Sequence, residues 1–452
     1  MTQVSTIAAI RFGYGLGPKS KPLNKTELLG GFAGADSIAK KFPVNSTKVV
    51  LQQVLAMRRA KKAANQKPAD RERYDATRKA LKNTAALGLL QATARVLDTD
   101  NAFFERLNWF WADHFTAVGK NLATRALAPA YLDEALRPHV AGRFADMLKA
   151  VITHPFMLTY LDQVSSFGPN SAIGKRRNKG LNENLARELL ELHTLGVGAG
   201  YGQHDVRQLA ELLTGLGLSK KQGFLFNPGI SEPGTKTILG VQYGGEHPNL
   251  EDIFSALENL AAHPETAHHL ARKLAVHFVS DQPDPDLIKH MTKAYLGSDG
   301  HLSAMYQAML EHPAAWQSLG QKAKQPFDFI LSILMAMGLT GQEFLNQKNK
   351  KLQKSVNNSL SAMGQPFMRA PGPDGWPEAA NEWITPQGLA NRITLSVRVS
   401  KFFRDRVTDP GDFLRATLAD AAGERLIWAV SQTEDTREGI TLVLASAEFN
   451  RR

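Results

Sequence analysis

The sequence contains no cysteine, which excludes disulfides, thiolate metal ligands and cysteine nucleophiles. It also lacks any apolar run close to the roughly 18 residues that span a bilayer, so no transmembrane helix is expected. Acidic residues are the scarcer charged type, because 43 Asp and Glu stand against 54 Lys and Arg. Hydrophobic residues make up 43% of the chain, a globular composition that excludes a largely disordered protein.

The formal charge of +11 is concentrated in the stretch 57–82, where ten Lys or Arg stand against three acidic residues. GKRRNK at 174–179 and the lysines of 348–354 add to it. Such a field favours anionic partners, for example an anionic polymer. The alternative is a solvated helix face whose arginines pair with nearby acids. Tyr74 is the only aromatic residue in the run, which disfavours a nucleic acid partner bound by base stacking.

Hydrophobic periodicity predicts a mainly α protein, a large multi-helix domain with a small β-hairpin insertion near 221–249. Residues 340–385 are rich in Pro, Gly and Trp and are expected to be irregular. Short β-like runs occur at Phe224–Phe226 and Thr237–Val241. The predicted helices cover 46–98, 101–118, 129–152, 155–163, 182–195, 203–213, 251–262, 264–278, 284–296, 301–311, 326–338 and 386–452.

Four regions follow from this pattern. Residues 1–100 form an N-terminal helical region with the basic stretch, and residues 101–220 form a central helical region. Residues 221–250 form the β-like insertion. Residues 251–452 form a C-terminal helical region that is expected to pack with the centre as one domain.

The stretch LNENLARELLELHTLG at 181–196 places an unusual number of polar residues on an apolar helix. At one residue per 100°, Glu188 and Glu191 lie on one flank of the leucine stripe, and His193 lies on the other, about 140° from Glu188. Neither HExxH nor the ExxH of di-iron bundles occurs in it, so this helix alone does not hold a metal. A site therefore needs convergent residues from other helices, with candidates Asp113, His114, His154, Asp162, His204 and Asp205.

Two kinds of site are open. His114, His193 and a carboxylate such as Asp113 are candidate ligands for a divalent metal such as zinc, with one position left for water. Glu188 and Glu191 are instead an acid/base pair if burial raises the pKa of one of them. In either case Asp162 and Arg187 lie in or beside the pocket, where the arginine orients an anionic group. The structural alternative is a polar network that fixes helix packing, because Glu183, Arg187 and Glu191 are four residues apart.

Several long strings in this sequence resemble a large bacterial family, domain of unknown function 1800. They include NENLARELLELHTLGVGAGYGQHDVRQLAELLTG at 182–215, NWFWADHF at 108–115 and GQPFMRAPGPDGW at 364–376. The resemblance covers nearly the whole chain from residue 85 onward. It implies an exported bacterial protein encoded beside a sulfatase-like protein, and therefore a periplasmic location, but it implies no activity.

The N-terminus has no basic segment followed by an apolar stretch, and this absence of a signal peptide implies a cytoplasmic location instead. Two functions follow as hypotheses. One is an envelope-associated hydrolase or transferase that acts on an anionic or carbohydrate substrate through a Glu/His/Arg pocket. The other is a non-catalytic helical partner or scaffold for the sulfatase-like neighbour.

Overall fold

The computed structural model describes residues 3–21, 23–30, 32, 36–219, 223–317, 319–346 and 350–452. Helices make up most of this part of the chain, so the mainly α prediction is confirmed. The first helices are α1 (Gln3–Ile7), α2 (Lys25–Gly30), α3 (Ser37–Lys41), α4 (Thr47–Gln66), α5 (Arg71–Asp98), α6 (Ala102–His114), α7 (Leu122–Tyr131), α8 (Phe144–Thr153) and α9 (Pro155–Tyr160).

The central helices are α10 (Ala172–Arg177), α11 (Asn184–Glu188), α12 (Gln203–Leu212), α13 (Leu250–Ala262), α14 (Pro264–Phe278), α15 (Pro285–Gly297) and α16 (Leu302–Glu311). The last helices are α17 (Pro326–Ala336), α18 (Gly341–Leu345), α19 (Lys351–Ala362), α20 (Ala380–Trp383), α21 (Pro386–Phe402), α22 (Pro410–Leu418), α23 (Glu424–Ser431), α24 (Thr436–Ala445) and α25 (Ala447–Asn450). None of the helices in the described ranges is both long and apolar enough to cross a bilayer.

The β insertion consists of two antiparallel hairpins. β1 (Leu216–Ser219) pairs with β2 (Gly223–Phe226), and β3 (Gly234–Ile238) pairs with β4 (Val241–Gly245). The prediction of a small β insertion is confirmed, although its first strand begins before residue 221 and residues 220–222 lie outside the described ranges. The single strand predicted over Thr237–Val241 is wrong, because the chain reverses at Leu239 and Gly240. Both residues have positive φ, as a tight hairpin turn requires.

Two further predictions are corrected. The single helix expected over 129–152 is broken, because Arg137–His139 forms a 3-10 turn containing Pro138 and regular helix resumes only at Phe144. The stretch 340–385 is irregular only in part, because it contains α18, α19 and α20. In α19 the buried residues Leu352, Val356 and Leu360 recur every four positions, a helical stripe within an otherwise polar sequence.

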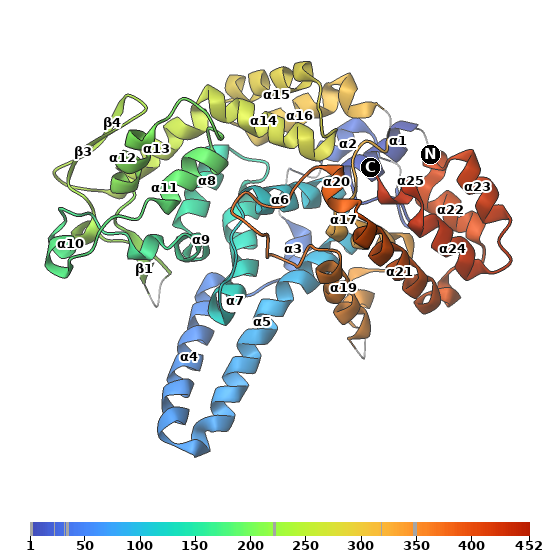
Figure 1. The fold of residues 1–452 in the computed structure, drawn as a ribbon, viewed down its shortest axis with the longest axis horizontal. Helices are drawn as coiled ribbons and strands as arrows, with labels where there is room; N and C mark the ends of the chain where they lie inside the picture. The colour runs from blue at the N-terminus through green and yellow to red at the C-terminus, as the bar shows by residue number, and fades with distance from the viewer. Residues whose placement is uncertain are drawn as a thin grey trace.

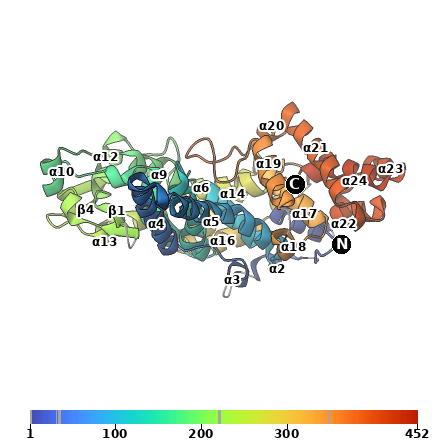
Figure 2. The same ribbon diagram turned by 90° about the horizontal axis from the view of Figure 1, so that it is seen from below.

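Figure 1 shows the arrangement of the helices around the central helix α6. Helices α14, α15 and α16 run along one edge, the segment from α8 to α13 with its strands lies at one end, and α21 to α25 lie at the other. The view from below confirms that the body is elongated along this direction (Figure 2). The antiparallel pair α4 and α5 projects from the body as a hairpin (Figure 1).

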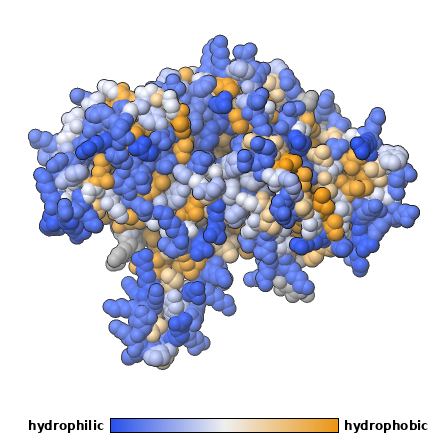
Figure 3. Space-filling model, viewed as in Figure 1, coloured by the Kyte–Doolittle hydropathy of each residue, from blue (hydrophilic) through white to orange (hydrophobic). Residues whose placement is uncertain are grey.

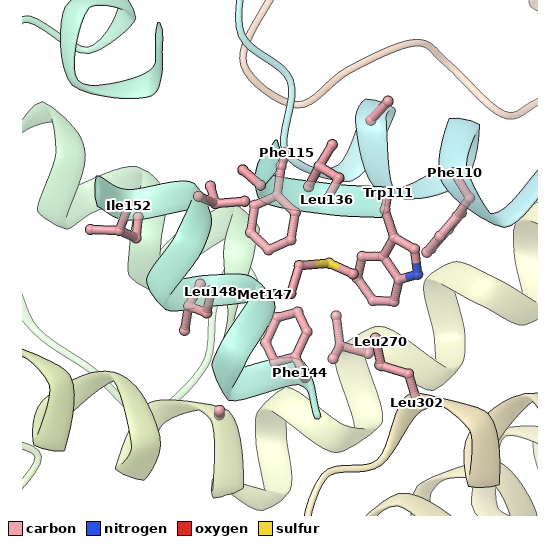
Figure 4. Packing of buried hydrophobic residues seen from close by; sticks show 14 of the residues in the cluster. Phe110, Trp111, Phe115, Leu136, Phe144, Met147, Leu148, Ile152, Leu270 and Leu302 are labelled. Carbon is pink, nitrogen blue, oxygen red and sulfur yellow. The ribbon is translucent and has the colours of Figure 1, made fainter. Parts of the chain in front are cut away.

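Two hydrophobic clusters form the interior. The larger contains side chains between Ala8 and Ala315. Figure 4 shows Trp111 of α6 and Phe115, the residue after this helix, facing Phe144 and Met147 of α8. The other is built mainly from the chain after residue 327, together with part of α5. The half-buried Trp109 of α6 packs against both clusters, so this helix joins them. The predicted boundaries at residues 100, 220 and 250 stay predictions.

Candidate functional site

The helix that carries Glu188 does not keep a regular α-helical turn. α11 ends at Glu188, and the π-turn Leu189–His193 follows it. A π-turn closes i→i+5 hydrogen bonds, so the 140° separation expected for an ideal α-helix does not apply here. His193 turns into the core with 1% of its surface exposed, whereas Glu188 is only partly buried. The two side chains therefore have different surroundings.

Arg187 lies between two carboxylates, as the spacing of four residues predicts. Its guanidinium is 3.6 Å from the Glu183 carboxylate and 3.3 Å from that of Glu191, and it also donates to Gln203 Oε1 at 2.9 Å. The Arg187 side chain is 41% exposed. An anionic ligand at this position would have to compete with both carboxylates.

Glu188 has no ion-pair partner among the described residues. Burial raises the pKa of Glu188 to about 7, and the neighbouring carboxylates of Glu191 and Asp374 act in the same direction. Burial also raises the pKa of Tyr160, again with contributions from Glu188 and Asp374. Glu188 therefore has the electrostatic property that the acid/base hypothesis requires, and its neighbour Asp374 comes from the loop before α20.

His114 and His193 come together in the core. His114 Nε2 is 3.2 Å from the carbonyl oxygen of His193, and the ring centroids are 6.2 Å apart. Because a carbonyl only accepts, Nε2 of His114 carries the proton and Nδ1 is left as a lone pair. Burial lowers the pKa of His193 to about 3 and that of His114 well below its usual value, with Lys273 contributing to both. Both imidazoles are thus neutral.

The metal hypothesis needs a third ligand near these histidines. Nδ1 of His114 and of His193 is buried without a hydrogen-bond partner, as an unmetallated ligand would be. Within the described ranges, however, no group of three His, Asp or Glu is arranged to hold an ion. The Asp113 carboxylate accepts a hydrogen bond from Trp376 N at 2.9 Å. The zinc site therefore stays a prediction.

The other sequence candidates lie outside this region or have structural roles. Asp162 is on the surface and pairs with Lys120 at 3.1 Å, both side chains being more than half exposed. His154 Nδ1 accepts from Phe156 N at 3.1 Å and so caps α9. Asp205 accepts from Gly202 N at 2.9 Å at the start of α12, and His204 beside it is exposed.

A pocket of about 70 Å³ opens beside Asp113, at the junction of the two hydrophobic clusters. A single water needs roughly 10–15 Å³ of such space, so the pocket has room for a group of several heavy atoms. Its walls combine aromatic rings with a few polar groups, the usual character of ligand sites. The aromatic lining residues are Tyr14, Trp109, Phe327, Phe367 and Trp376, and the ionisable ones besides Tyr14 are Arg106, Asp113, His277 and Asp328.

Asp113 is the unusual acid of this pocket. Burial raises the pKa of Asp113 to about 7, against the opposing effect of Lys273. Its carboxylate forms no ion pair within the described part of the chain, and its hydrogen bond comes from the backbone of Trp376. Gly375 allows that approach, because it has φ +87° and a Cβ there would lie 2.7 Å from Asp113 Oδ2. The backbone of the loop is thus held directly against the carboxyl group.

One face of α14 presents three ionisable residues to this region, each four positions after the last: His269, Lys273 and His277. Lys273 acts on the pKa values of both His114 and Asp113, so it lies close to each of them. Burial lowers the pKa of Lys273, while Asp113 opposes that effect. Lys273 has no ion pair or hydrogen bond among the described residues.

His277 belongs instead to a fully engaged network. Arg106 donates to its Nε2 at 3.2 Å, so Nδ1 carries the proton and lies 2.5 Å from the Glu378 carboxylate. Lys322 also contacts Glu378, at 3.1 Å. Burial would raise the pKa of Glu378, but His277 and Lys322 outweigh it and lower that pKa to about 2. The network attaches the 364–378 loop to α14, and this loop crosses α6 in Figure 1.

The sequence patterns considered above do not single out Lys273, His277, Arg106 and Glu378. A signal was present for two of them, because His269-x3-Lys273-x3-His277 marks a polar stripe along one helix face. No local pattern identifies Arg106 or Glu378, which join the site through contacts between distant segments.

The sequence matches the family described as "Protein of unknown function (DUF1800)" over residues 8–451. The chain belongs to this family. The DUF1800 match includes α6, α14 and the 364–378 loop, so every side chain described above lies within the family region. No curated protein and no solved structure matches the chain.

Proposed function

We propose that this DUF1800 protein is a hydrolase or transferase that acts on a carbohydrate or anionic substrate in the pocket beside Asp113. The observation that carries the proposal is a carboxyl group with a pKa of about 7 on the wall of a pocket rich in aromatic rings. A carboxyl group that is partly protonated near neutral pH is suited to general acid or base catalysis. Aromatic faces suit the apolar C–H surface of a sugar ring.

The residues have separate roles in this proposal. Asp113 protonates the leaving group or accepts a proton from the attacking group. Glu188 supplies a second carboxyl group with a pKa of about 7. The nearby charge of Asp374 on the loop contributes to raising the pKa of both Glu188 and Asp113. Lys273 holds an anionic group of the substrate, because it has no carboxylate partner within the described residues. Arg187 and Glu191 orient the Glu188 side of the site.

Substrate turnover in two matched variants tests the proposal. Asp113→Asn removes the titrating group but keeps an oxygen for the Trp376 N–H. Asp162→Asn is the matched control, because it removes an exposed carboxylate whose ion-pair partner among the described residues is Lys120. The probes are 4-nitrophenyl glycosides, 4-nitrophenyl phosphate and 4-nitrophenyl sulfate. We expect turnover of one class, reduced about 100-fold or more by Asp113→Asn and unchanged by Asp162→Asn. Equal activity of the two variants would remove Asp113 from the mechanism.

A non-catalytic partner of the sulfatase-like neighbour is the second candidate. The mutual pairing of Glu183, Arg187 and Glu191 supports it, since these charges are already satisfied within the helix region. Under this proposal the protein lies in the cell envelope and co-purifies with the neighbour. Wild-type protein that converts none of the chromogenic probes but retains the sulfatase-like protein on a column favours this second function.

A further inference from the structure

The projecting hairpin of α4 and α5, residues 47–98, carries the basic stretch 57–82, and we call this hairpin the arm. α4 alone has 20 residues, which corresponds to a length of about 30 Å. The two helices pack through Val50, Val54, Ala60 and Leu81, all buried in the hairpin. In the space-filling view the surface of the projecting part of the arm is mostly hydrophilic (Figure 3).

Every basic residue in the distal part of the arm, residues 57–82, is exposed. Only three acidic residues accompany them, and among the described ion pairs only Arg71 with Asp75 at 3.3 Å involves this segment. The alternative of arginines neutralised by nearby acids therefore does not describe the arm. The exposed cations are Arg58, Arg59, Lys61, Lys62, Lys67, Arg71, Arg73, Arg78, Lys79 and Lys82.

Several arginines of the body are instead buried and paired with carboxylates. Arg137 contacts both Glu105 and Asp36, Arg95 lies 2.5 Å from Asp133, and Arg452 lies 2.7 Å from Asp328. Those side chains are buried and their charges are balanced. The arm cations stabilise no contact of this kind, and like charges at such density repel one another. Ion pairing within the fold therefore does not account for their concentration.

We infer that the arm is a binding element for an anionic polysaccharide. The cations occupy the outer sides of both helices, with pairs such as Arg58 and Lys62 one helical turn apart, a spacing close to the length of one sugar unit. A flexible polyanion can follow such a surface. A flat membrane would contact only one side of it. In the described arm Val49 near the base is the only exposed large hydrophobic residue, so the tip has no apolar anchor for a bilayer.

A nucleic acid is less well matched for two reasons. Tyr74, the only ring among residues 57–82, is half-buried and lies 5.5 Å from the Arg71 guanidinium, so no free aromatic face is available for a base. The base of the arm also reaches the pocket, because a Cβ on Gly88 of α5 would lie 3.2 Å from the ring of Phe367, which lines it. The choice of a polysaccharide rests in this respect on the proposed function, whereas polyanion binding by the arm does not.

Two variants with the same change in charge test the inference in the full-length protein. The arm variant combines Arg58→Gln, Arg59→Gln, Lys61→Gln and Lys62→Gln, at positions that are exposed and unpaired in the described structure. The matched control combines Lys175→Gln, Arg176→Gln, Arg177→Gln and Lys179→Gln, at four exposed positions in and after α10. Glutamine is a good helix former, so both variants should fold, and circular dichroism checks this.

The probes are heparin and polygalacturonate, and the readout is the Kd at about 0.15 M ionic strength. We expect the arm variant to bind about 10-fold or more weakly and with a smaller dependence on salt, and the control to bind within about 2-fold of wild type. Equal losses in both variants, or no binding by the wild type, would overturn the inference.

Two further probes, duplex DNA and phosphatidylglycerol vesicles, test whether the arm binds a nucleic acid or a membrane instead of a polysaccharide. Arm-dependent binding that is tighter to duplex DNA than to either polysaccharide would replace the polysaccharide with nucleic acid. Arm-dependent binding to phosphatidylglycerol vesicles alone would replace it with a membrane. Because binding is measured without turnover, inactivity of the pocket leaves this result unaffected.

Discussion

Replacing Asp113 by asparagine should stabilise the protein at alkaline pH, although most substitutions of buried residues destabilise. Asparagine has nearly the same shape, and its oxygen can still accept from Trp376 N, which lies 2.9 Å from Oδ1 of the carboxylate. The variant differs mainly in carrying no charge. A residue whose removal improves stability is characteristic of a functional site, where an unfavourable group is retained for its chemistry.

The sign and size of the effect follow from the pKa of Asp113, which burial raises from 3.8 to about 7. Between these values the folded protein retains a proton that the unfolded chain has lost, so wild-type stability falls as pH rises and the penalty is complete above pH 7. A shift of this size corresponds to about 4 kcal/mol at most, and solvent at the pocket mouth reduces it to about 2–3 kcal/mol. Below the unfolded pKa the two proteins should have equal stability.

The measurement is urea unfolding of wild type and Asp113→Asn at pH 4 and at pH 8, followed by tryptophan fluorescence. Trp109 and Trp376 line the pocket, so the signal reports on this region. We expect the free energy of unfolding of the variant, relative to wild type, to improve by about 2–3 kcal/mol between the two pH values with unchanged m-values. A relative stability that does not change with pH, or that moves the other way, would refute the argument that Asp113 is buried as an unpaired acid.

Three further changes test the surroundings of the site. Glu378→Gln should lower the free energy of unfolding at pH 7 by about 3 kcal/mol, because it removes an ionised partner of His277. The pKa of Glu378 is held near 2, so this contribution to wild-type stability is present above the unfolded pKa of 4.5 and is lost as pH falls toward 2. Urea unfolding at several pH values checks the trend, and a constant difference would contradict it. Gly375→Ala should lower the free energy of unfolding in urea by about 1–3 kcal/mol, because Gly375 has a φ of +87° and the new Cβ would lie 2.7 Å from the Asp113 carboxylate. An unchanged free energy of unfolding would mean that the loop is not held against Asp113 at this residue. Tyr306→Phe should lower the free energy of unfolding, measured by thermal unfolding, by about 1–3 kcal/mol, because Trp111 Nε1 loses the hydroxyl acceptor that lies 2.6 Å away in the core. An unchanged free energy of unfolding would show that another acceptor replaces this hydroxyl.

The sequence predicts local features well where the signal is a spacing along one helix. The pairs of Arg187 with Glu183 and with Glu191 follow from residues four apart, and the structure has both. The same reasoning fails at His193, because the π-turn that begins at Leu189 changes the direction of the following side chains. A π-turn has no reliable sequence signature. Which flank a polar residue occupies is therefore predictable only where the helix is regular.

Contacts between distant segments were beyond prediction for a different reason. Trp376 N meets the Asp113 carboxylate across 263 residues, and Arg106 meets His277 across 171. Helix periodicity identifies the face on which a residue lies, but it does not identify the helix that packs against that face. The sequence suggested Asp113 and His114 as metal ligands, which stays a prediction, but it did not indicate that the Asp113 carboxyl group lines a pocket and accepts a hydrogen bond from the loop backbone.

The pocket beside Asp113 is a better candidate for the proposed reaction than the helix that carries Glu188, because the two places differ in which of their charged groups are already paired. Arg106, His277 and Glu378 satisfy one another, and the tautomer of His277 is fixed by a donor on one side and an acceptor on the other. A wall built in this way keeps its geometry when a ligand enters, as a preorganised site requires. Asp113 and Lys273 lie next to that wall without ion-pair partners among the described residues, so they are the groups whose charge can respond to a substrate. On the Glu188 helix the cation, Arg187, is already shared by two carboxylates, and a ligand there would have to displace them.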